Sequence, residues 1–127
     1  MSQISAERIQ NELNQVKEGV AAITGQKDMR YLRTPRGIFN DRSLTVSHDL
    51  NYTNVFWSVA YRDWEPKQQK GWEYAYKNVM AQLHPGAVIL LHSVSSDNTE
   101  ALGRIIDAAR AQGYQFKSLD EMKLRTP

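Results

Sequence analysis

The chain has 127 residues, of which 41% are hydrophobic, 24% charged and 9% aromatic, the profile of a globular domain rather than a disordered segment. Its 16 basic and 14 acidic residues are scattered and leave a formal net charge of +2, which is too weak to indicate a nucleic-acid-binding protein. Cysteine is absent, so disulfides, thiolate metal sites and cysteine nucleophiles are excluded. The sequence shows no signal peptide and no apolar run of about 18 residues, which leaves its localisation open.

The first predicted element is an amphipathic helix of about 20 residues that begins at Ser5. Ser2 and Ser5 are suitable N-caps, and Gly25 is a suitable end. The apolar positions recur every three or four residues and comprise Ile9, Leu13, Val16, Val20 and Ile23. Because the remaining positions are polar, we expect this helix to lie on the outside of the fold.

Four short strands are predicted along the rest of the chain, over residues 29–33, 54–59, 87–91 and 114–116. The five consecutive apolar residues of the third are typical of a strand buried on both faces, as in a parallel sheet. The intervening helices cover residues 41–50, 72–83 and 96–112, with Asp41 or Ser43 capping the first of these and Ser96 or Asp97 the last. Ser118 and Glu121 have capping-box spacing for a terminal turn.

The alternation of helices and strands predicts a parallel sheet joined by right-handed crossovers. Half of a (β/α) barrel and a small doubly wound sheet both fit this order. In either fold, the carboxyl ends of the strands lie at one edge, where ligands bind. Polar residues follow three of the strands, namely residues 33–37, Asp63 with Trp64, and His92. We therefore expect these three groups to converge.

The same residues carry a resemblance to a known family. Residues 33–37 (RTPRG), 57–64 (WSVAYRDW) and 90–92 (LLH) resemble the third, fourth and fifth motifs of the polysaccharide deacetylases, the NodB homology domain of carbohydrate esterase family 4. Residues 113–119 (GYQFKSL) are similar to the family's usual ending. More narrowly, residues 70–75 (KGWEYA), 84–86 (HPG) and 95–102 (SSDNTEAL) resemble the delta-lactam-biosynthetic de-N-acetylases of endospore-forming bacteria.

The resemblance implies the C-terminal half of a distorted (β/α) barrel, with about four parallel strands. Members of this family hold a divalent metal, usually zinc, with an aspartate and two histidines, while a neighbouring aspartate acts as the base. These four residues come from an Asp-Asp pair and a His-x-x-x-His run, and the sequence contains neither. We therefore expect residues 1–127 to be a partial domain that lacks the first two motifs and any metal site, with Met1 an internal residue or a misassigned start.

Three residues match catalytic positions of the family. His92 resembles the general acid that protonates the departing amine, a role that suits imidazole because it gains and loses a proton near neutral pH. Asp63 resembles its charge partner, which favours the imidazolium and fixes the ring. Arg33 resembles the arginine that pairs with the base aspartate, a residue that this chain does not contain.

Three further residues match substrate-binding positions. The resemblance implies that the backbone N–H of Arg36 helps to bind the oxyanion and that its guanidinium faces the lactyl carboxylate of muramic acid. Trp64 and Leu90 would line the acetyl pocket. The chain departs from the usual pattern at Thr34, where proline is common, and at Ala60, where many relatives have aspartate.

The remaining candidate residues are interpreted as structural. His48 is expected on a helix surface and His84 in the turn before the third strand. Trp72 and Tyr76 have the spacing of core residues on one helix face, although aromatic residues could also stack on a sugar.

The function implied by the resemblance is metal-dependent removal of an acetyl group from peptidoglycan amino sugars, in particular N-acetylmuramic acid on the way to the muramic delta-lactam of spore cortex. The chain alone is expected to be inactive. Two alternatives are a non-catalytic glycan-binding pseudoenzyme and a fragment that completes a barrel with another chain or self-associates through open strand edges. A small flavodoxin-like domain is a further alternative. It is disfavoured because no glycine-rich phosphate loop follows any predicted strand. An exported or cell-envelope location is expected of a full-length family member.

Overall fold

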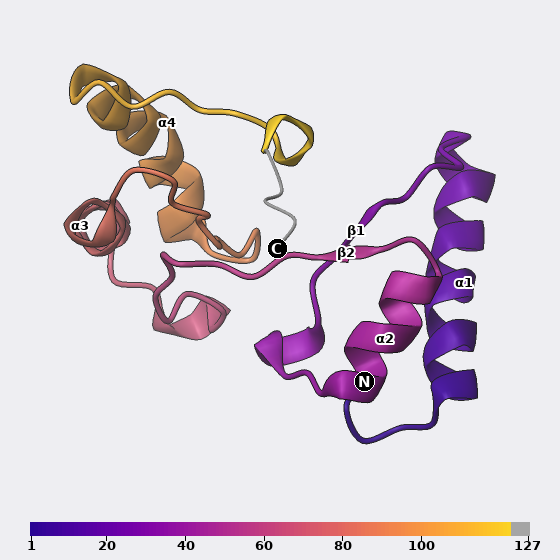
Figure 1. Cartoon of the computed structure of the whole chain (residues 1–127). Coiled ribbons are helices and arrows are strands. Elements are labelled where there is room, and N and C mark those ends of the chain that lie inside the picture. The colour runs from indigo at the N-terminus through magenta and orange to yellow at the C-terminus, as the bar shows by residue number, and fades with distance from the viewer. Residues whose placement is uncertain (123–127) are drawn as a thin grey trace. The chain divides into compact units, whose positions relative to one another are not determined.

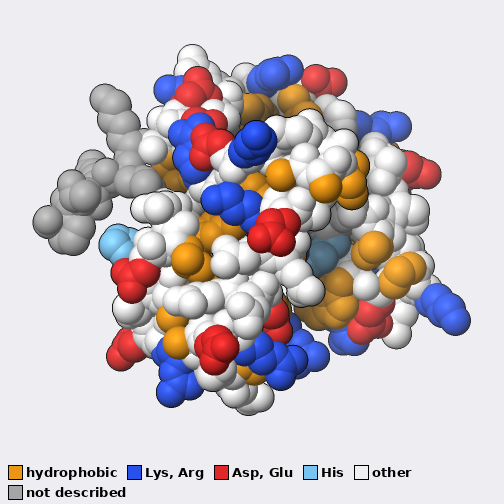
Figure 2. Space-filling view, turned by 90° about the vertical axis from the view of Figure 1, so that its right-hand side faces the viewer, with side chains coloured by type: hydrophobic (Ala, Val, Ile, Leu, Met, Phe, Trp, Pro, Cys, Tyr) orange, Lys and Arg blue, Asp and Glu red, His pale blue; other side chains and the backbone are white. Residues whose placement is uncertain are grey.

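The structure is a computed structural model of the whole chain, and it describes residues 1–122 (Figure 1). Two compact units make up the chain, Met1–Phe56, called unit 1, and Trp57–Pro127, called unit 2, and each is described by itself. Among the described residues, no helix has both the length and the hydrophobicity needed to cross a bilayer. The face shown in Figure 2 carries basic, acidic and hydrophobic side chains interspersed, in keeping with the small net charge.

Unit 1 begins with α1 (Ala6–Thr24). The Ser5 hydroxyl accepts a hydrogen bond from the Arg8 N–H at 3.2 Å, and Gly25 ends the helix in the left-handed conformation at φ 75°, so the predicted start and end are confirmed. The apolar stripe is only partly buried. Ile9 and Leu13 lie in the core, whereas Val16 and Ile23 are 57% and 87% exposed.

The second helix of unit 1, α2 (Asp41–Asp49), packs beside α1 (Figure 1). Its N-cap is Asn40, which precedes both predicted candidates, Asp41 and Ser43. The Asn40 side chain accepts from the Ser43 N–H at 2.9 Å, and the Ser43 hydroxyl accepts from the Asn40 N–H at 3.0 Å. This reciprocal pair satisfies two helix-end donors at once and so favours the earlier start. The core of unit 1 contains Ile9, Leu13, Val46 and Tyr52.

Unit 1 also contains a parallel pair of strands, β1 (Tyr31–Leu32) and β2 (Thr53–Asn54), with Tyr31 opposite Thr53 and Leu32 opposite Asn54. After β1 the chain forms a short 3-10 helix, Pro35–Gly37, in which Arg36 and Gly37 both have positive φ, 58° and 69°. The parallel direction agrees with the prediction, but both strands are shorter than predicted.

Unit 2 is built around α3 (Trp72–Gln82) and α4 (Ser96–Ala111), which lie side by side (Figure 1). The N-cap of α4 is Ser95, one residue earlier than predicted, because its hydroxyl accepts from the Asn98 N–H at 3.1 Å. The Ser118–Glu121 capping box is present at the 3-10 helix Leu119–Glu121. The core comprises Val59, Ala75, Val79, Ala101 and Ile105, and the half-buried Trp72 and Tyr76 pack against it as predicted.

The strands predicted in unit 2 are reduced to one parallel bridge between Val59 and Ile89. The Leu90 N–H donates to the Val59 carbonyl at 2.9 Å, and the Val59 N–H donates to the Val88 carbonyl at 3.2 Å. Residues 87–91 are half-buried rather than buried on both faces, and residues 114–116 form no ladder with the described part of the chain. About four strands are therefore not shown within residues 1–122, which contain β1, β2 and this one bridge. A physical reason is that residues 87–91 pair along only one edge within this described part of the chain, and interior parallel strands need two.

Candidate functional site

A two-point polar contact in unit 2 joins Asp63 and His92, which follow the Val59–Ile89 bridge along their respective segments. The His92 ring Nδ1 lies 2.7 Å from Asp63 Oδ1, and the His92 backbone N–H donates to Asp63 Oδ2, also at 2.7 Å. Asp63 is 2% exposed, while 29% of the His92 side chain reaches the surface. A buried carboxylate thus binds both the ring and the backbone of a partly accessible histidine.

These contacts define which ring nitrogen is available. An ionised carboxylate only accepts hydrogen bonds, so the Nδ1 atom of His92 carries the proton and donates the hydrogen bond to Asp63. Among the described residues, Nε2 of His92 has no hydrogen-bond partner. The pair therefore presents Nε2 as the atom that can give or take a proton.

Asn98, which sequence reasoning did not assign to the site, is a further hydrogen-bond donor to the Asp63 carboxylate. It lies in the first turn of α4, and its Nδ2 donates to Asp63 Oδ2 at 2.6 Å and to the His92 carbonyl at 3.0 Å. The Tyr61 hydroxyl donates to Asn98 Oδ1. Burial raises the pKa of Tyr61 above its ordinary 10.0, opposed by the Ser95 hydroxyl and reinforced by the nearby carboxylates. The phenol therefore remains a donor at neutral pH.

Trp64 and Leu90 are placed near His92 in different ways. The Trp64 ring meets the His92 imidazole edge-on, with 6.1 Å between ring centroids, and Trp64 is 53% exposed. Leu90 is half-buried and lies two residues before His92, at the alternation that puts side chains on one face of an extended segment. The structure thus brings Asp63, Trp64 and His92 together at the end of the bridge.

Arg33 and Arg36 belong to unit 1, and both are exposed. Neither side chain forms an ion pair or hydrogen bond within residues 1–122, and the backbone N–H of Arg36 donates to no group there. Thr34 beside them is buried, and its hydroxyl has no partner among these residues. The predicted convergence of Arg33 and Arg36 with His92 stays a prediction.

The described residues do not fit a metal centre, because no group of three or more His, Asp or Glu side chains lies together among them. His84 is held by the Ser58 hydroxyl and the Pro85 carbonyl, at 2.9 Å each, and His48 is exposed beside Asp49. Both occupy the structural positions predicted for them.

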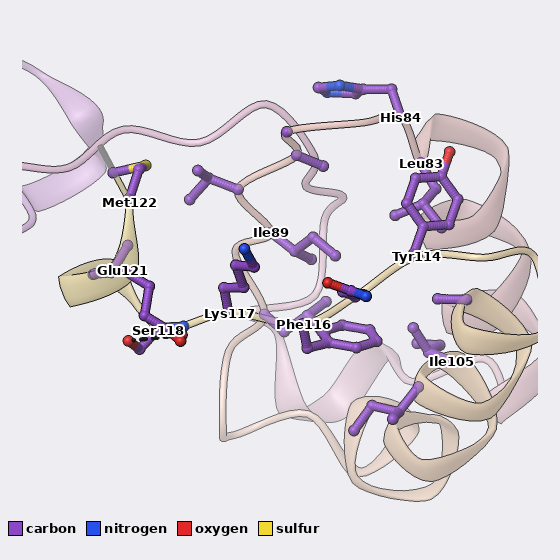
Figure 3. A pocket seen from close by; sticks show the side chains of 18 of the residues that line it. Leu83, His84, Ile89, Ile105, Tyr114, Phe116, Lys117, Ser118, Glu121 and Met122 are labelled. Carbon is purple, nitrogen blue, oxygen red and sulfur yellow. Dashed lines mark hydrogen bonds between the residues drawn. The ribbon is translucent and has the colours of Figure 1, made fainter. Parts of the chain in front are cut away.

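A separate pocket of about 610 Å³ lies in unit 2 between residues 83–91, α4 and residues 114–122. Figure 3 shows Leu83, Ile89, Ile105 and Phe116 around it. The pocket is mainly apolar, and neither His92 nor Asp63 lines it. Along its wall, the backbone N–H groups of Ile89 and Leu91 form no hydrogen bond with the described part of the chain.

Known proteins resemble this chain along most of its length. A family model described as polysaccharide deacetylase matches residues 1–55. A protein of Geobacillus stearothermophilus described as an uncharacterized 30.6 kDa protein is 51% identical over 96% of this chain and 46% of its own length. The peptidoglycan-N-acetylmuramic acid deacetylase PdaA of Bacillus subtilis is 50% identical over 93% of this chain and 45% of its own length.

Solved structures show the same relationship. The structure of Bacillus subtilis PdaA, described as a family 4 carbohydrate esterase, matches 93% of this chain and 50% of its own with a TM-score of 0.89 at 50% identity. A family 4 pseudoenzyme of Bacillus anthracis matches 91% of this chain and 39% of its own with a TM-score of 0.81 at 31% identity. The chain spans about half the length of the relatives that it matches. Its α/β fold is similar to part of the domain of these family 4 carbohydrate esterases, and its sequence is similar to the polysaccharide deacetylase family.

Proposed function

We propose that this chain contributes the proton-donating part of a deacetylase site that acts on the N-acetyl groups of peptidoglycan amino sugars, N-acetylmuramic acid in particular. The observation that carries the proposal is the His92–Asp63 pair, with both carboxylate oxygens of Asp63 engaged and Nε2 of His92 unpartnered among the described residues. The 50% identity to a peptidoglycan-N-acetylmuramic acid deacetylase supports the choice of sugar.

The proton step follows from this geometry. When the amide C–N bond breaks, the departing nitrogen needs a proton, and the imidazolium of His92 gives it from Nε2. The neutral ring that remains keeps its Nδ1 proton, because Asp63 Oδ1 accepts that hydrogen bond at 2.7 Å. Asp63 therefore stabilises the ring before the transfer and fixes its tautomer afterwards.

Unit 1 would supply substrate contacts. The backbone N–H of Arg36, which has no partner among the described residues, is available to bind an oxyanion. Its exposed guanidinium suits the lactyl carboxylate of muramic acid. Arg33 would hold a base aspartate contributed from outside the described residues, and Trp64 with Leu90 would line the acetyl pocket.

The described residues do not fit the divalent metal of the family, so no water-activating step is assigned to them. We expect the metal, zinc as the first choice, and the base to be held by other residues of a complete deacetylase domain. On this proposal the 127-residue chain alone is inactive, the complete enzyme acts at the cell envelope, and its product is on the route to the muramic delta-lactam of spore cortex.

The open backbone edge at Ile89 and Leu91 is the contact proposed for the remainder of such a domain. An extended segment pairing with these N–H groups would also cover the apolar pocket beside them (Figure 3). Light scattering of the chain, alone and mixed with the remaining half of PdaA, tests this contact. A 1:1 complex supports it, whereas a homodimer that persists in the mixture assigns the edge to a second copy.

Acetate release from muramic-acid-containing glycan, with added zinc, tests the activity. We expect no release by the chain alone, release by a complete domain that includes these 127 residues, and loss of that release by His92→Ala. Appreciable turnover by the chain alone would contradict the proposed inactivity.

A second candidate function is glycan binding without turnover. The observation that favours it is the likeness to a family pseudoenzyme, at 31% identity and a TM-score of 0.81. Affinity for muramic-acid glycan that is independent of zinc, together with no acetate release by the complete domain, would support binding over catalysis.

A further inference from the structure

We infer that Asn98 is a positioning residue that holds Asp63 and His92 in one fixed arrangement. The inference rests on the proposed function of His92 and adds to it a residue that lies outside the strand-end motifs. It is carried by the side-chain contacts of a single residue, which is 5% exposed and reaches the carboxylate, the histidine backbone and a tyrosine.

The amide of Asn98 uses both of its donors within the site. One goes to Asp63 Oδ2 at 2.6 Å and the other to the His92 carbonyl at 3.0 Å. Its oxygen accepts from the Tyr61 hydroxyl. A side-chain amide offers two N–H donors and one carbonyl acceptor, so each of its polar groups has a partner here.

The two carboxylate oxygens of Asp63 have different partners, and this difference orients the carboxylate. Oδ2 accepts from the Asn98 amide and from the His92 backbone N–H, which leaves Oδ1 to face the ring Nδ1. A carboxylate held at one oxygen by two donors cannot rotate freely about its terminal torsion, which is otherwise a soft one. Asn98 therefore fixes the direction of the ring contact through the carboxylate and the His92 carbonyl, which its amide binds.

The first turn of α4, which carries Asn98, is itself held by hydrogen bonds. Its own N–H donates to Ser95 Oγ at 3.1 Å, and Ser95 Oγ donates to Gln69 Oε1 at 2.6 Å. The neighbouring Asp97 is buried, and its carboxylate accepts from the backbone N–H groups of Lys70 and Gly71. The first turn of α4 is thus tied to the loop before α3, so the amide is held on a rigid element.

Nitrogen-15 NMR of the His92 ring in the 127-residue chain tests the inference. In the natural chain we expect the Nδ1-protonated tautomer, with an Nδ1–H signal that exchanges slowly with water. In Asn98→Ala and in the nearly isosteric Asn98→Asp, which lacks the donor, we expect that proton to exchange at least about tenfold faster, the factor for losing a hydrogen bond to a charged group. Asn78→Ala is the matched control, because within residues 1–122 the Asn78 side-chain amide bonds only to the Tyr74 carbonyl.

Two results would overturn the inference. One is an unchanged Nδ1–H signal in a folded Asn98 variant, as judged by unshifted methyl signals of Val79 and Ile105 in the core. The other needs no variant: solvent-rate exchange of the Asn98 side-chain amide protons in the natural chain would show that the contacts are not formed. Because neither readout requires turnover, a positive NMR result with no acetate release from a complete domain would disprove the proposed function alone.

Discussion

Polar residues follow parallel strand pairing in both units, yet the two strand ends are built differently. In unit 2, Asp63 is buried and bound by a histidine ring, a backbone N–H and the Asn98 amide. In unit 1, Arg33 and Arg36 are exposed, and their side chains have no partner within residues 1–122. A site is preformed where a helix start is anchored next to the strand end, as the start of α4 is. A polar residue at a strand end does not by itself make a preformed site.

The largest expected effect on stability comes from removing Asp63, the residue that His92 and Asn98 both bind in unit 2. Asp63→Ala leaves the ring, one backbone N–H and the Asn98 amide without their acceptor, and should destabilise unit 2 by about 3 kcal/mol. Arg33→Ala, at the other strand end, should change stability by less than about 0.5 kcal/mol because its side chain is exposed. Native-state hydrogen exchange of α4 and α1 amides measures the two units separately.

The outcome of this pair of variants decides the comparison directly. Faster exchange in α4 for Asp63→Ala, with α1 unchanged, is the expected pattern. A loss below about 1 kcal/mol for Asp63→Ala would mean that the carboxylate network adds little to the stability of unit 2.

A smaller effect is expected at the two serine caps. Ser5→Ala and Ser95→Ala each remove an N-cap acceptor, at 3.2 Å and 3.1 Å, and each should cost about 1 kcal/mol. Ser95 also donates to Gln69, so its replacement should cost more than that of Ser5. Thermal unfolding and the hydrogen exchange of α1 and α4 amides rank the two variants. Equal losses of stability would show that the Gln69 contact contributes nothing.

A pH effect on stability is expected from Tyr61 in unit 2. Burial raises the pKa of Tyr61 above 10.0, so the folded state binds this proton more tightly than the unfolded state. The resulting stability is fully present below pH 10.0 and is lost as the pH rises through the folded-state pKa. Denaturant titrations of the natural chain and Tyr61→Phe between pH 8 and pH 12 measure the difference, which should shrink at the alkaline end. A constant difference would contradict the shift.

The sequence predicted the local features of this chain better than the contacts that depend on distant neighbours. The start and end of α1 follow from Ser5 and Gly25, because capping is decided within a few residues. Strand lengths did not follow from residues 87–91, since an apolar run becomes a strand only to the extent that neighbours pair with it. The convergence of Asp63 and His92 was predictable from strand ends and motifs, and the structure brings them to 2.7 Å.

Asn98 was missed for a related reason. Residues 95–98 (SSDN) were interpreted as a helix start and as part of a family-like segment. The helix start is correct, but neither interpretation gave a role to the side chain of Asn98. Its bond to Asp63 spans 35 positions of sequence. One signal was present: an amide in the first turn of a helix, six residues after the candidate acid, lies within reach of the strand end that this helix follows.

The smallest expected effect concerns the turn of unit 1. Arg36 has φ 58° and ψ 9°, a left-handed conformation that costs an ordinary residue about 1 kcal/mol and glycine much less. Arg36→Gly should therefore stabilise unit 1 by about 0.5 kcal/mol, whereas Arg33→Gly, whose φ is not positive, should destabilise it by a similar amount. Exchange of α1 amides measures both. If Arg36→Gly instead lowers stability, the arginine side chain makes contacts that outweigh the strain, and unit 1 has a preformed strand end of its own.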